Sequence, residues 1–255
     1  MGEVASQRAG EAEALRTGVE LGLTLIDTAE MYGEGETESF VGEALAGLRD
    51  RVTLVSKAYP QNAGRGRLER ACEASLKRLR TDRLDLYLLH WRGSVPLSET
   101  IEGMEGLKRA GKVRAWGVSN LDLGDMDDLA AAGGADCATD QVLYNVTRRG
   151  PEFDLLPALA ERGVPVMAYS PVEQGRLPRG GALKAVADRH DVTAYQVALA
   201  WAVRSGNVLA VPKAADVAHV RQNRQALDLV LTAEDADEID VAFSPPERKT
   251  RLEML

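Results

Sequence analysis

Cysteine is scarce in this chain of 255 residues, which contains only Cys72 and Cys137. Two isolated cysteines are too few for a disulfide framework or a zinc site. No other grouping of side chains offers a ligand set for a metal, so we expect no metal in the protein. The scarcity of cysteine is typical of a protein that folds in a reducing cytoplasm.

Long apolar runs are also missing. The longest fall well short of the ~20 residues that a membrane-spanning helix needs, and the start, M-G-E-V-A-S-Q-R, has no apolar segment of a secretory signal. The net charge of −8 argues against a nucleic acid or an anionic membrane as partner, although it leaves room for a local basic pocket that holds a phosphate. We therefore expect a cytoplasmic monomer whose partners are small molecules.

Short apolar strands alternate with helical patterns at a spacing of roughly 30 residues, which is typical of βαβ units around a parallel sheet. No linker, low-complexity segment or charge block divides the chain, so we predict a single domain over residues 1–255. Seven strands are predicted, at Leu23–Asp27, Val52–Lys57, Leu84–His90, Val113–Ser119, Ala138–Leu143, Val164–Ser170 and Val208–Lys213. A closed barrel of this type has eight strands in roughly 250 residues. The expected fold is therefore an α/β barrel, of the (β/α)8 TIM type, without its first N-terminal strand.

The stretch L-I-D-T-A-E-M-Y-G-E-G (25–35) organises the rest of the chain. A buried strand ends on Asp27 and opens into a glycine-containing loop with Tyr32, as strands do at the C-terminal rim of an α/β barrel. Two later strands end in a comparable way, on Lys57 and His90. Because the carboxyl ends of parallel strands meet at one edge of the sheet, these side chains are expected to converge.

Three of the four residues form a plausible proton-transfer unit. A phenol has a pKa of about 10 and is a poor catalyst near neutrality, unless an ammonium beside it stabilises the phenolate. A carboxylate that pairs with the ammonium keeps the lysine charged despite burial. Tyr32, Lys57 and Asp27 fit these roles, and His90 fits a hydrogen bond to a substrate oxygen. Taken alone, His90 is better explained as a buried structural histidine, and its company with the other three residues favours the functional interpretation.

Seven short motifs in this order resemble the aldo-keto reductase family, and in particular its bacterial members that reduce methylglyoxal and other small aldehydes. They cover nearly the whole chain and read D-T-A-E-M-Y-G-E-G (27–35), L-V-S-K (54–57), L-Y-L-L-H-W (86–91), G-V-S-N (117–120), Q-V-L-Y-N (141–145), A-Y-S-P (168–171) and V-P-K (211–213). The resemblance implies hydride transfer from NADPH to a carbonyl carbon. It implies Tyr32 as the proton donor, Lys57 and Asp27 as its tuning pair, and His90 as the residue that orients the carbonyl.

The same resemblance implies a set of cofactor contacts, which runs from the nicotinamide to the adenosine end. Trp91 either lines the substrate pocket or only covers the rim, and short rim loops favour a small carbonyl substrate. The implied cofactor-binding residues are Ser119, Asn120, Gln141, Tyr169, Ser170, Pro171, Val172, Gln174, Lys213, Ala214, His219, Gln222 and Asn223.

Two departures from the family pattern stand out. Members that bind NADPH usually have Ser or Thr after the V-P-K lysine and Arg in the next helix, where this chain has Ala214 and His219. We still expect NADPH because Lys213 is in place, with a weak preference over NADH. The first barrel strand is also missing, and we expect either a truncated chain or a start placed too late.

Two other readings compete with a carbonyl reductase. Some relatives are regulatory subunits that bind the cofactor and sense redox state, and the chain could also be an inactive truncated reductase. The intact set of Asp27, Tyr32, Lys57 and His90 disfavours a role in binding alone. Saturable turnover distinguishes the reductase from both alternatives.

Overall fold

The computed structural model describes residues 1–255. The chain forms two compact units, Met1–Asp140 with Ala214–Val220 and Gln141–Lys213 with Arg221–Leu255. The single domain expected from the sequence stays a prediction.

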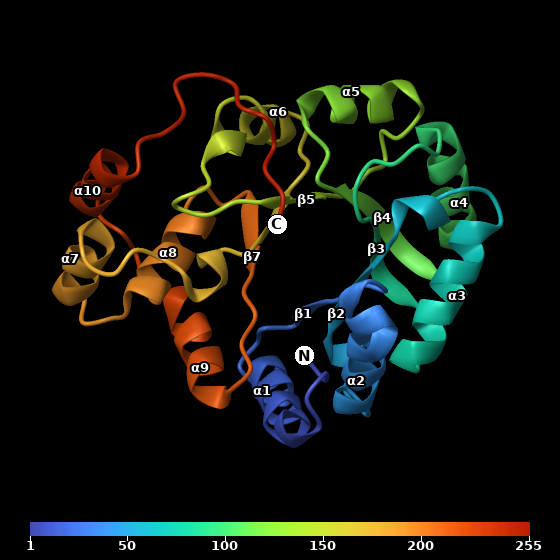
Figure 1. Cartoon of the computed structure of the whole chain (residues 1–255), viewed down its shortest axis with the longest axis horizontal. Coiled ribbons are helices and arrows are strands. Elements are labelled where there is room, and N and C mark those ends of the chain that lie inside the picture. The colour runs from blue at the N-terminus through green and yellow to red at the C-terminus, as the bar shows by residue number, and fades with distance from the viewer. The chain divides into compact units, whose positions relative to one another are not determined.

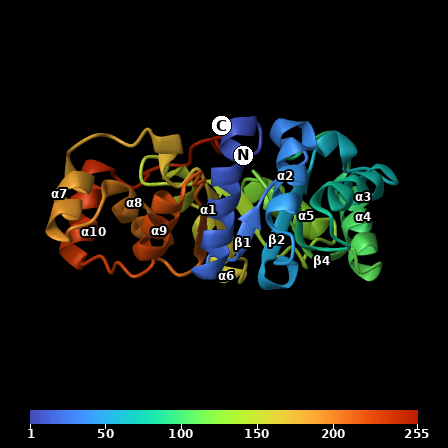
Figure 2. The same cartoon turned by 90° about the horizontal axis from the view of Figure 1, so that it is seen from below.

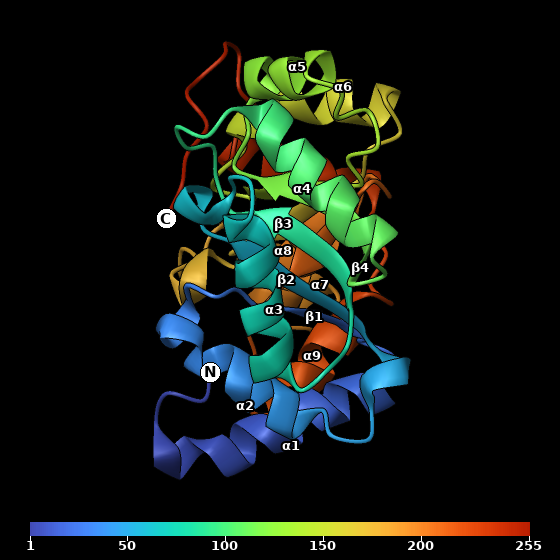
Figure 3. The same ribbon diagram turned by 90° about the vertical axis from the view of Figure 1, so that its right-hand side faces the viewer.

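The first unit alternates helices and strands. Its strands β1 to β4 are parallel and neighbour one another in chain order. Helices α2, α3 and α4 lie side by side along one face of these strands (Figures 1 and 3), and α1 packs beside α2 (Figure 2). The elements are α1 (Arg8–Glu20), β1 (Leu25–Asp27), α2 (Glu36–Ala44), β2 (Thr53–Ala58), α3 (Arg67–Leu79), β3 (Leu84–Leu89), α4 (Leu97–Arg109), β4 (Val113–Ser119) and α5 (Leu123–Ala131), and β5 (Asp140–Leu143) begins at the last residue of this part.

Local sequence explains these elements. In α3 the buried side chains Leu68, Cys72 and Leu79 recur at helical spacing, and basic residues occupy the last turn, where the helix dipole favours them. Residues 54–58 of β2 and 86–89 of β3 are buried without alternation, as expected for parallel strands covered on both faces. Trp116 of β4 is 1% exposed and belongs to the core.

In the second unit, β6 (Val166–Tyr169) and β7 (Val208–Val211) pair in parallel. Helix α7 packs against α8 and α10 (Figure 1). The Thr193 hydroxyl caps α8 by accepting a hydrogen bond from the backbone amide of Gln196. In return, the Gln196 side-chain oxygen accepts a hydrogen bond from the backbone amide of Thr193. The helices are α6 (Leu155–Glu161), α7 (Ala182–Arg189), α8 (Ala194–Val203) and α10 (Ala233–Ala242), and α9 (Val217–Ala226) begins in the first unit.

The number of strands predicted from the sequence, seven, is confirmed. The first helix begins at Arg8, after a short 3-10 turn over Ala5–Gln7. Arg8 is held there because its guanidinium donates to the Gly2 carbonyl and pairs with Glu43. These are tertiary contacts that helical periodicity does not indicate.

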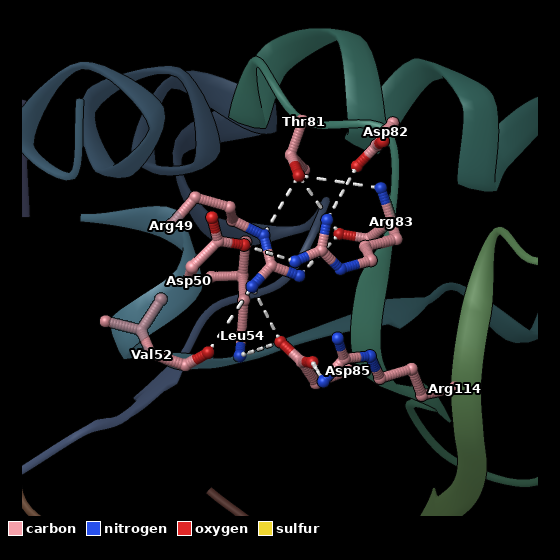
Figure 4. Close-up of polar contacts among 9 residues, drawn as sticks. All are labelled: Arg49, Asp50, Val52, Leu54, Thr81, Asp82, Arg83, Asp85 and Arg114. Atoms are coloured by element: carbon pink, nitrogen blue, oxygen red, sulfur yellow. Dashed lines mark hydrogen bonds and ion pairs between the residues drawn. The ribbon is translucent and has the colours of Figure 1, made fainter. Parts of the chain in front are cut away.

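A network of charges lies where β2 and β3 begin, at the other end of these strands from Lys57 and His90 (Figure 4). Asp85 of β3 accepts a hydrogen bond from the Leu54 amide at 2.9 Å. Its carboxylate also pairs with Arg49 at 2.8 Å and with Arg114 at 3.0 Å. Side chains at this end of a barrel strand usually serve stability, and a carboxylate that binds two cations and a backbone amide fits that role.

Candidate functional site

Lys57 is the centre of the candidate site. The side chain is completely buried near the end of β2. Its Nζ donates hydrogen bonds to Asp27 Oδ2 at 2.7 Å, to the Thr28 carbonyl at 2.8 Å and to Tyr32 Oη at 3.3 Å. An ammonium has three hydrogens, so each has an acceptor.

The environment of Lys57 favours its charged form. Burial by itself lowers the pKa of Lys57, but the charge of Asp27, with the effect of Tyr32 and the hydrogen bonds to both, outweighs burial and raises the pKa above its ordinary value of 10.5. The Thr28 carbonyl adds a partner that no sequence motif pointed to. Lys57 is therefore an ammonium at neutral pH and lies against the phenol oxygen.

Tyr32 is placed by a short turn after β1. Its amide donates to the Ala29 carbonyl at 3.1 Å, and a 3-10 turn follows over Tyr32–Gly35. Gly35 has φ of +92°, a conformation that favours glycine, and a Cβ there would lie 2.6 Å from the Arg78 side chain, which would have to shift. The turn leaves the ring partly exposed, with Lys57 Nζ 4.9 Å from its centroid.

His90 follows the last residue of β3, and its amide donates to the Ala58 carbonyl at 2.9 Å. The side chain is 7% exposed and its ring meets the Tyr32 ring edge-on at 5.9 Å. Burial, and then the charge of Lys57, lowers the pKa of His90 to about 3. The ring is therefore neutral at physiological pH, and its buried Nδ1 has no hydrogen-bond partner within the protein.

Two rim aromatic residues border this group. Trp91 is half-buried and its ring lies 5.0 Å from that of His90. Tyr59 meets Trp91 edge-on at 5.8 Å. The sequence analysis did not single out Tyr59, although an aromatic residue just beyond the strand that carries Lys57 is a usable signal. Glu30 was missed as well, and it fixes the loop by accepting from the Tyr59 amide at 2.6 Å.

Ser119 and Asn120 come at the end of β4, next to His90. Asn120 Nδ2 donates to the His90 carbonyl at 3.1 Å and to Ser119 Oγ at 3.0 Å. Ser119 is 1% exposed, and Asn120 has φ of +59°. The first unit therefore brings seven of the predicted site residues together, namely Asp27, Tyr32, Lys57, His90, Trp91, Ser119 and Asn120.

Further predicted residues lie in the second unit. Gln141 is buried in β5, Tyr169 ends β6, and residues 170–175 form a turn in which Pro171 is buried and Gln174 is exposed. Lys213 is exposed two residues after β7 ends. The other predicted residues of this unit are Val172 in the turn and Gln222 and Asn223 in α9.

Ala214 and His219 belong to the first unit, which includes the segment Ala214–Val220. His219 is exposed, and its Nδ1 lies 2.7 Å from the Asp216 carboxylate. Its backbone amide donates to the same carboxylate at 2.9 Å. The histidine at the position of the family arginine is thus already engaged by an acidic residue.

Strained backbone coincides with the predicted cofactor segments. Seven non-glycine residues have positive φ, and four of them are predicted cofactor residues or their direct neighbours, namely Asn120, Ser170, Glu173 and Gln174. Left-handed backbone at such residues persists only where surrounding contacts enforce it, and it is common at ligand sites. A run of left-handed residues also turns backbone amides toward a common anion.

Other features of the molecule do not compete with this site. A cavity of about 330 Å³ beside the Tyr32 turn is lined in part by Arg8 and Arg78, but these cations already pair with Glu43 and Glu38. No group of three His, Cys, Asp or Glu side chains could hold a metal ion. None of the helices combines the length and apolar character that a membrane crossing requires.

Comparison with curated proteins gives relatives along the whole chain. Methylglyoxal reductase YeaE of Escherichia coli (strain K12) is 53% identical over 261 residues, which cover 100% of this chain and 92% of that protein. Glyoxal reductase of Bacillus subtilis (strain 168) is 31% identical over 237 residues, which cover 92% of this chain and 84% of that protein.

Solved structures agree. The aldo/keto reductase from Klebsiella pneumoniae in complex with NADP and acetate matches with a TM-score of 0.98 and 53% identity, over 100% of this chain and 92% of that one. The same TM-score, identity and coverage hold for an aldo-keto reductase from that organism in complex with NADPH. The match confirms the predicted fold class, an α/β barrel of parallel strands. The Aldo/keto reductase family itself matches over residues 2–243. The chain therefore belongs to the aldo/keto reductase family.

Proposed function

We propose that the chain is an NADPH-dependent reductase that converts small aldehydes and ketones to alcohols, with methylglyoxal as the representative substrate. The observation that carries the proposal is the contact between the phenol oxygen of Tyr32 and the buried ammonium of Lys57. Relatives support the substrate class, since the two curated enzymes above are named for methylglyoxal and glyoxal. The Klebsiella pneumoniae structures, which contain NADP and NADPH, support the cofactor.

Tyr32 acts as the proton donor to the carbonyl oxygen. When its Oη releases the proton, the phenolate that remains is stabilised by the ammonium of Lys57 at 3.3 Å. Asp27 keeps that ammonium in place through its 2.7 Å ion pair. The three residues act as a unit, because removing any one changes the charge that the other two experience.

His90 orients the carbonyl and does not protonate it. With a pKa of about 3, the ring carries no surplus proton at neutral pH. A neutral imidazole still has one N–H donor, which can hydrogen-bond the carbonyl oxygen. This division of roles leaves Tyr32 as the acid of the group.

NADPH, when bound, supplies the hydride that adds to the carbonyl carbon. Ser119, Asn120 and Gln141 would hold its carboxamide, and Tyr169 would stack on the nicotinamide ring. Ser170, Pro171, Val172 and Gln174 would bind the pyrophosphate. The left-handed conformations of Ser170 and Gln174 support this assignment, because such backbone suits the binding of an anion.

The adenosine end depends on Lys213, with Ala214, His219, Gln222 and Asn223 around it. Lys213 is exposed, so its ammonium can reach a 2′-phosphate. His219 is engaged by Asp216, and that carboxylate opposes an added negative charge. We therefore expect only a weak preference for NADPH over NADH. Tighter binding of NADH than of NADPH in parallel titrations would overturn this expectation.

Small substrates suit the aromatic rim. Trp91 contacts both the His90 ring and Tyr59, which supports its role as a wall of the substrate pocket. One copy of the chain carries Asp27, Tyr32, Lys57 and His90 together, which supports activity as a monomer. Both cysteines are free and buried, which suits a cytoplasmic location.

The test is NADPH oxidation with methylglyoxal, followed by the loss of cofactor absorbance, for the unaltered chain and for Tyr32→Phe. Turnover is expected in the unaltered chain and should fall by roughly 100-fold or more in the variant. Tyr87→Phe is the matched control, since Tyr87 is a buried tyrosine of the same sheet and is not one of the predicted site residues. Equal turnover in Tyr32→Phe and Tyr87→Phe would refute the assignment. Cofactor binding without turnover in the unaltered chain would favour a regulatory subunit.

A further inference from the structure

The turn after β6 is built from unusual backbone. Ser170, Glu173 and Gln174 have φ of +49°, +49° and +53°, and Gly175 follows at +80°. Only glycine adopts this region easily, and other residues need contacts that hold them there. Two internal hydrogen bonds, from the Glu173 amide to Ser170 O and from the Gly175 amide to Val172 O, close the turn. Both are backbone hydrogen bonds, so they do not fix the Glu173 side chain.

The Glu173 carboxylate is held by the segment that follows β5. It is 7% exposed and accepts hydrogen bonds from Arg148 Nη2 at 2.8 Å, from Arg148 Nε at 3.2 Å and from Asn145 Nδ2 at 2.8 Å. Asn145 Nδ2 also donates to the Ser170 carbonyl at 2.9 Å. The Asn145 side chain thus joins Ser170, where the turn begins, to the Glu173 carboxylate, and Arg148 binds Glu173 alone.

The grip by Arg148 has the geometry of a strong ion pair. A guanidinium that donates from two nitrogens to one carboxylate fixes direction as well as distance. The hydrogen bond to Arg148 is the main reason that the pKa of Glu173 lies below its ordinary value. Glu173 is therefore a carboxylate at neutral pH, and Arg148 is its cation.

The third guanidinium nitrogen of Arg148, Nη1, contacts the C-terminal tail. Its Nη1 pairs with Glu253 at 2.7 Å, and Glu253 is about half exposed. Lys249 of the same tail pairs with Asp154 at 2.9 Å. Exposed ion pairs contribute little individually to stability. We therefore expect that the pair with Glu253 does not determine the position of the Arg148 side chain.

We propose that Arg148 is a positioning residue for the cofactor, which holds the 170–175 turn in its left-handed form and cancels the charge of Glu173 beside the pyrophosphate. This inference rests on the proposed binding of NADPH along that turn. A pyrophosphate bears negative charge on each phosphate, so an unpaired carboxylate in the same turn would repel it. Arg148 removes that repulsion by pairing with Glu173.

The experiment compares dissociation constants for NADPH, from fluorescence titration, in four chains: unaltered, Arg148→Met, Glu173→Gln and the double variant. Arg148→Met is expected to raise the dissociation constant about tenfold, because it leaves a carboxylate without its cation. Glu173→Gln should change it by less than about threefold. The double variant should bind NADPH more tightly than Arg148→Met, because it regains the part of the loss that comes from charge repulsion and its amide can still accept from Asn145.

Three controls separate positioning from a general structural role. The ligand 2′-AMP has the adenosine 2′-phosphate and no pyrophosphate, so its dissociation constant should be the same in all four chains. Glu253→Gln removes the other partner of Arg148 and should raise the constant for NADPH by no more than about twofold. Arg148→Lys keeps the charge without the two-nitrogen geometry, and its constant should lie between those of the unaltered chain and Arg148→Met.

Several outcomes would overturn the inference. One is an Arg148→Met chain that binds NADPH as tightly as the unaltered chain, even if its melting temperature falls. Others are a double variant as weak as Arg148→Met, or a Glu253→Gln effect as large as that of Arg148→Met. Failure of the unaltered chain to bind NADPH would overturn the proposed function as well, so the two failures are distinguishable.

Discussion

His90 makes a sharp prediction about stability and pH. Burial and the nearby charge of Lys57 lower its pKa to about 3 in the folded chain, whereas a histidine in an unfolded chain has a pKa of about 6.5. Between these values the unfolded chain binds a proton at this position and the folded chain does not. Protonation therefore favours unfolding, so the contribution of His90 to stability declines as the pH falls below 6.5.

The size of the effect follows from the two pKa values. Between pH 7 and pH 5, His90 should lower the free energy of unfolding by about 2 kcal/mol. At pH 5 this figure depends almost entirely on the unfolded value, because a folded pKa near 3 leaves the native ring unprotonated. His90→Gln keeps a donor of similar size and has no group that titrates in this range, so this part of the acid sensitivity should disappear.

Two measurements check the prediction. Urea unfolding at pH 7 and pH 5 should show a loss of stability that is about 2 kcal/mol smaller in His90→Gln than in the unaltered chain. The chain has three histidines, so NMR of the histidine rings should show one resonance that does not titrate between pH 8 and pH 5 and is absent from the variant. Parallel stability changes in the two chains, or a His90 resonance that titrates near pH 6.5, would refute the reasoning.

Three further predictions concern groups that are buried or paired. Lys57→Met should lower turnover by roughly 100-fold or more and the free energy of unfolding by about 3 kcal/mol or more, because Asp27 loses its ammonium partner. Kinetics and urea unfolding test this prediction, and normal turnover would contradict it. Asp85→Asn should lower the free energy of unfolding by about 1–3 kcal/mol with turnover unchanged, since its contacts lie at the opposite end of the strands (Figure 4); an activity loss without a stability loss would count against that role. Burial raises the pKa of the Cys72 and Cys137 thiols to about 12, so a thiol reagent at pH 8 should label neither in the folded chain and both after unfolding, and rapid labelling of the native chain would disagree.

Much of the catalytic group could be predicted because parallel strands impose a simple geometry. Asp27, Lys57 and His90 lie at or just beyond the ends of apolar strands, and Asp27 pairs in register with Val55 of the neighbouring strand. Strand ends that share an edge bring their side chains together whatever the intervening helices contain. Tyr32 could be added because the glycines after it indicate a tight turn.

Other parts of the site could not be read from the sequence. Glu30 fixes the rim by accepting from the Tyr59 amide, and a glutamate in a loop has no pattern that indicates such a partner. His219 looked like a replacement for a basic residue, but Asp216 engages it. Both contacts depend on where loops turn, which is set by local backbone and not by periodicity.

The sequence by itself determined the alternation of strands and helices and the order of the residues that end the strands. The spacing of hydrophobic residues along the sequence indicates which segments are strands and which are helices. Parallel pairing of the strands then places their carboxyl ends at the same edge of the sheet. The tertiary structure alone decided that His90 is neutral, and that Arg148 joins Glu173 to a residue far along the chain. Protonation and long-range ion pairs depend on distances and burial in three dimensions, which no spacing along the chain encodes.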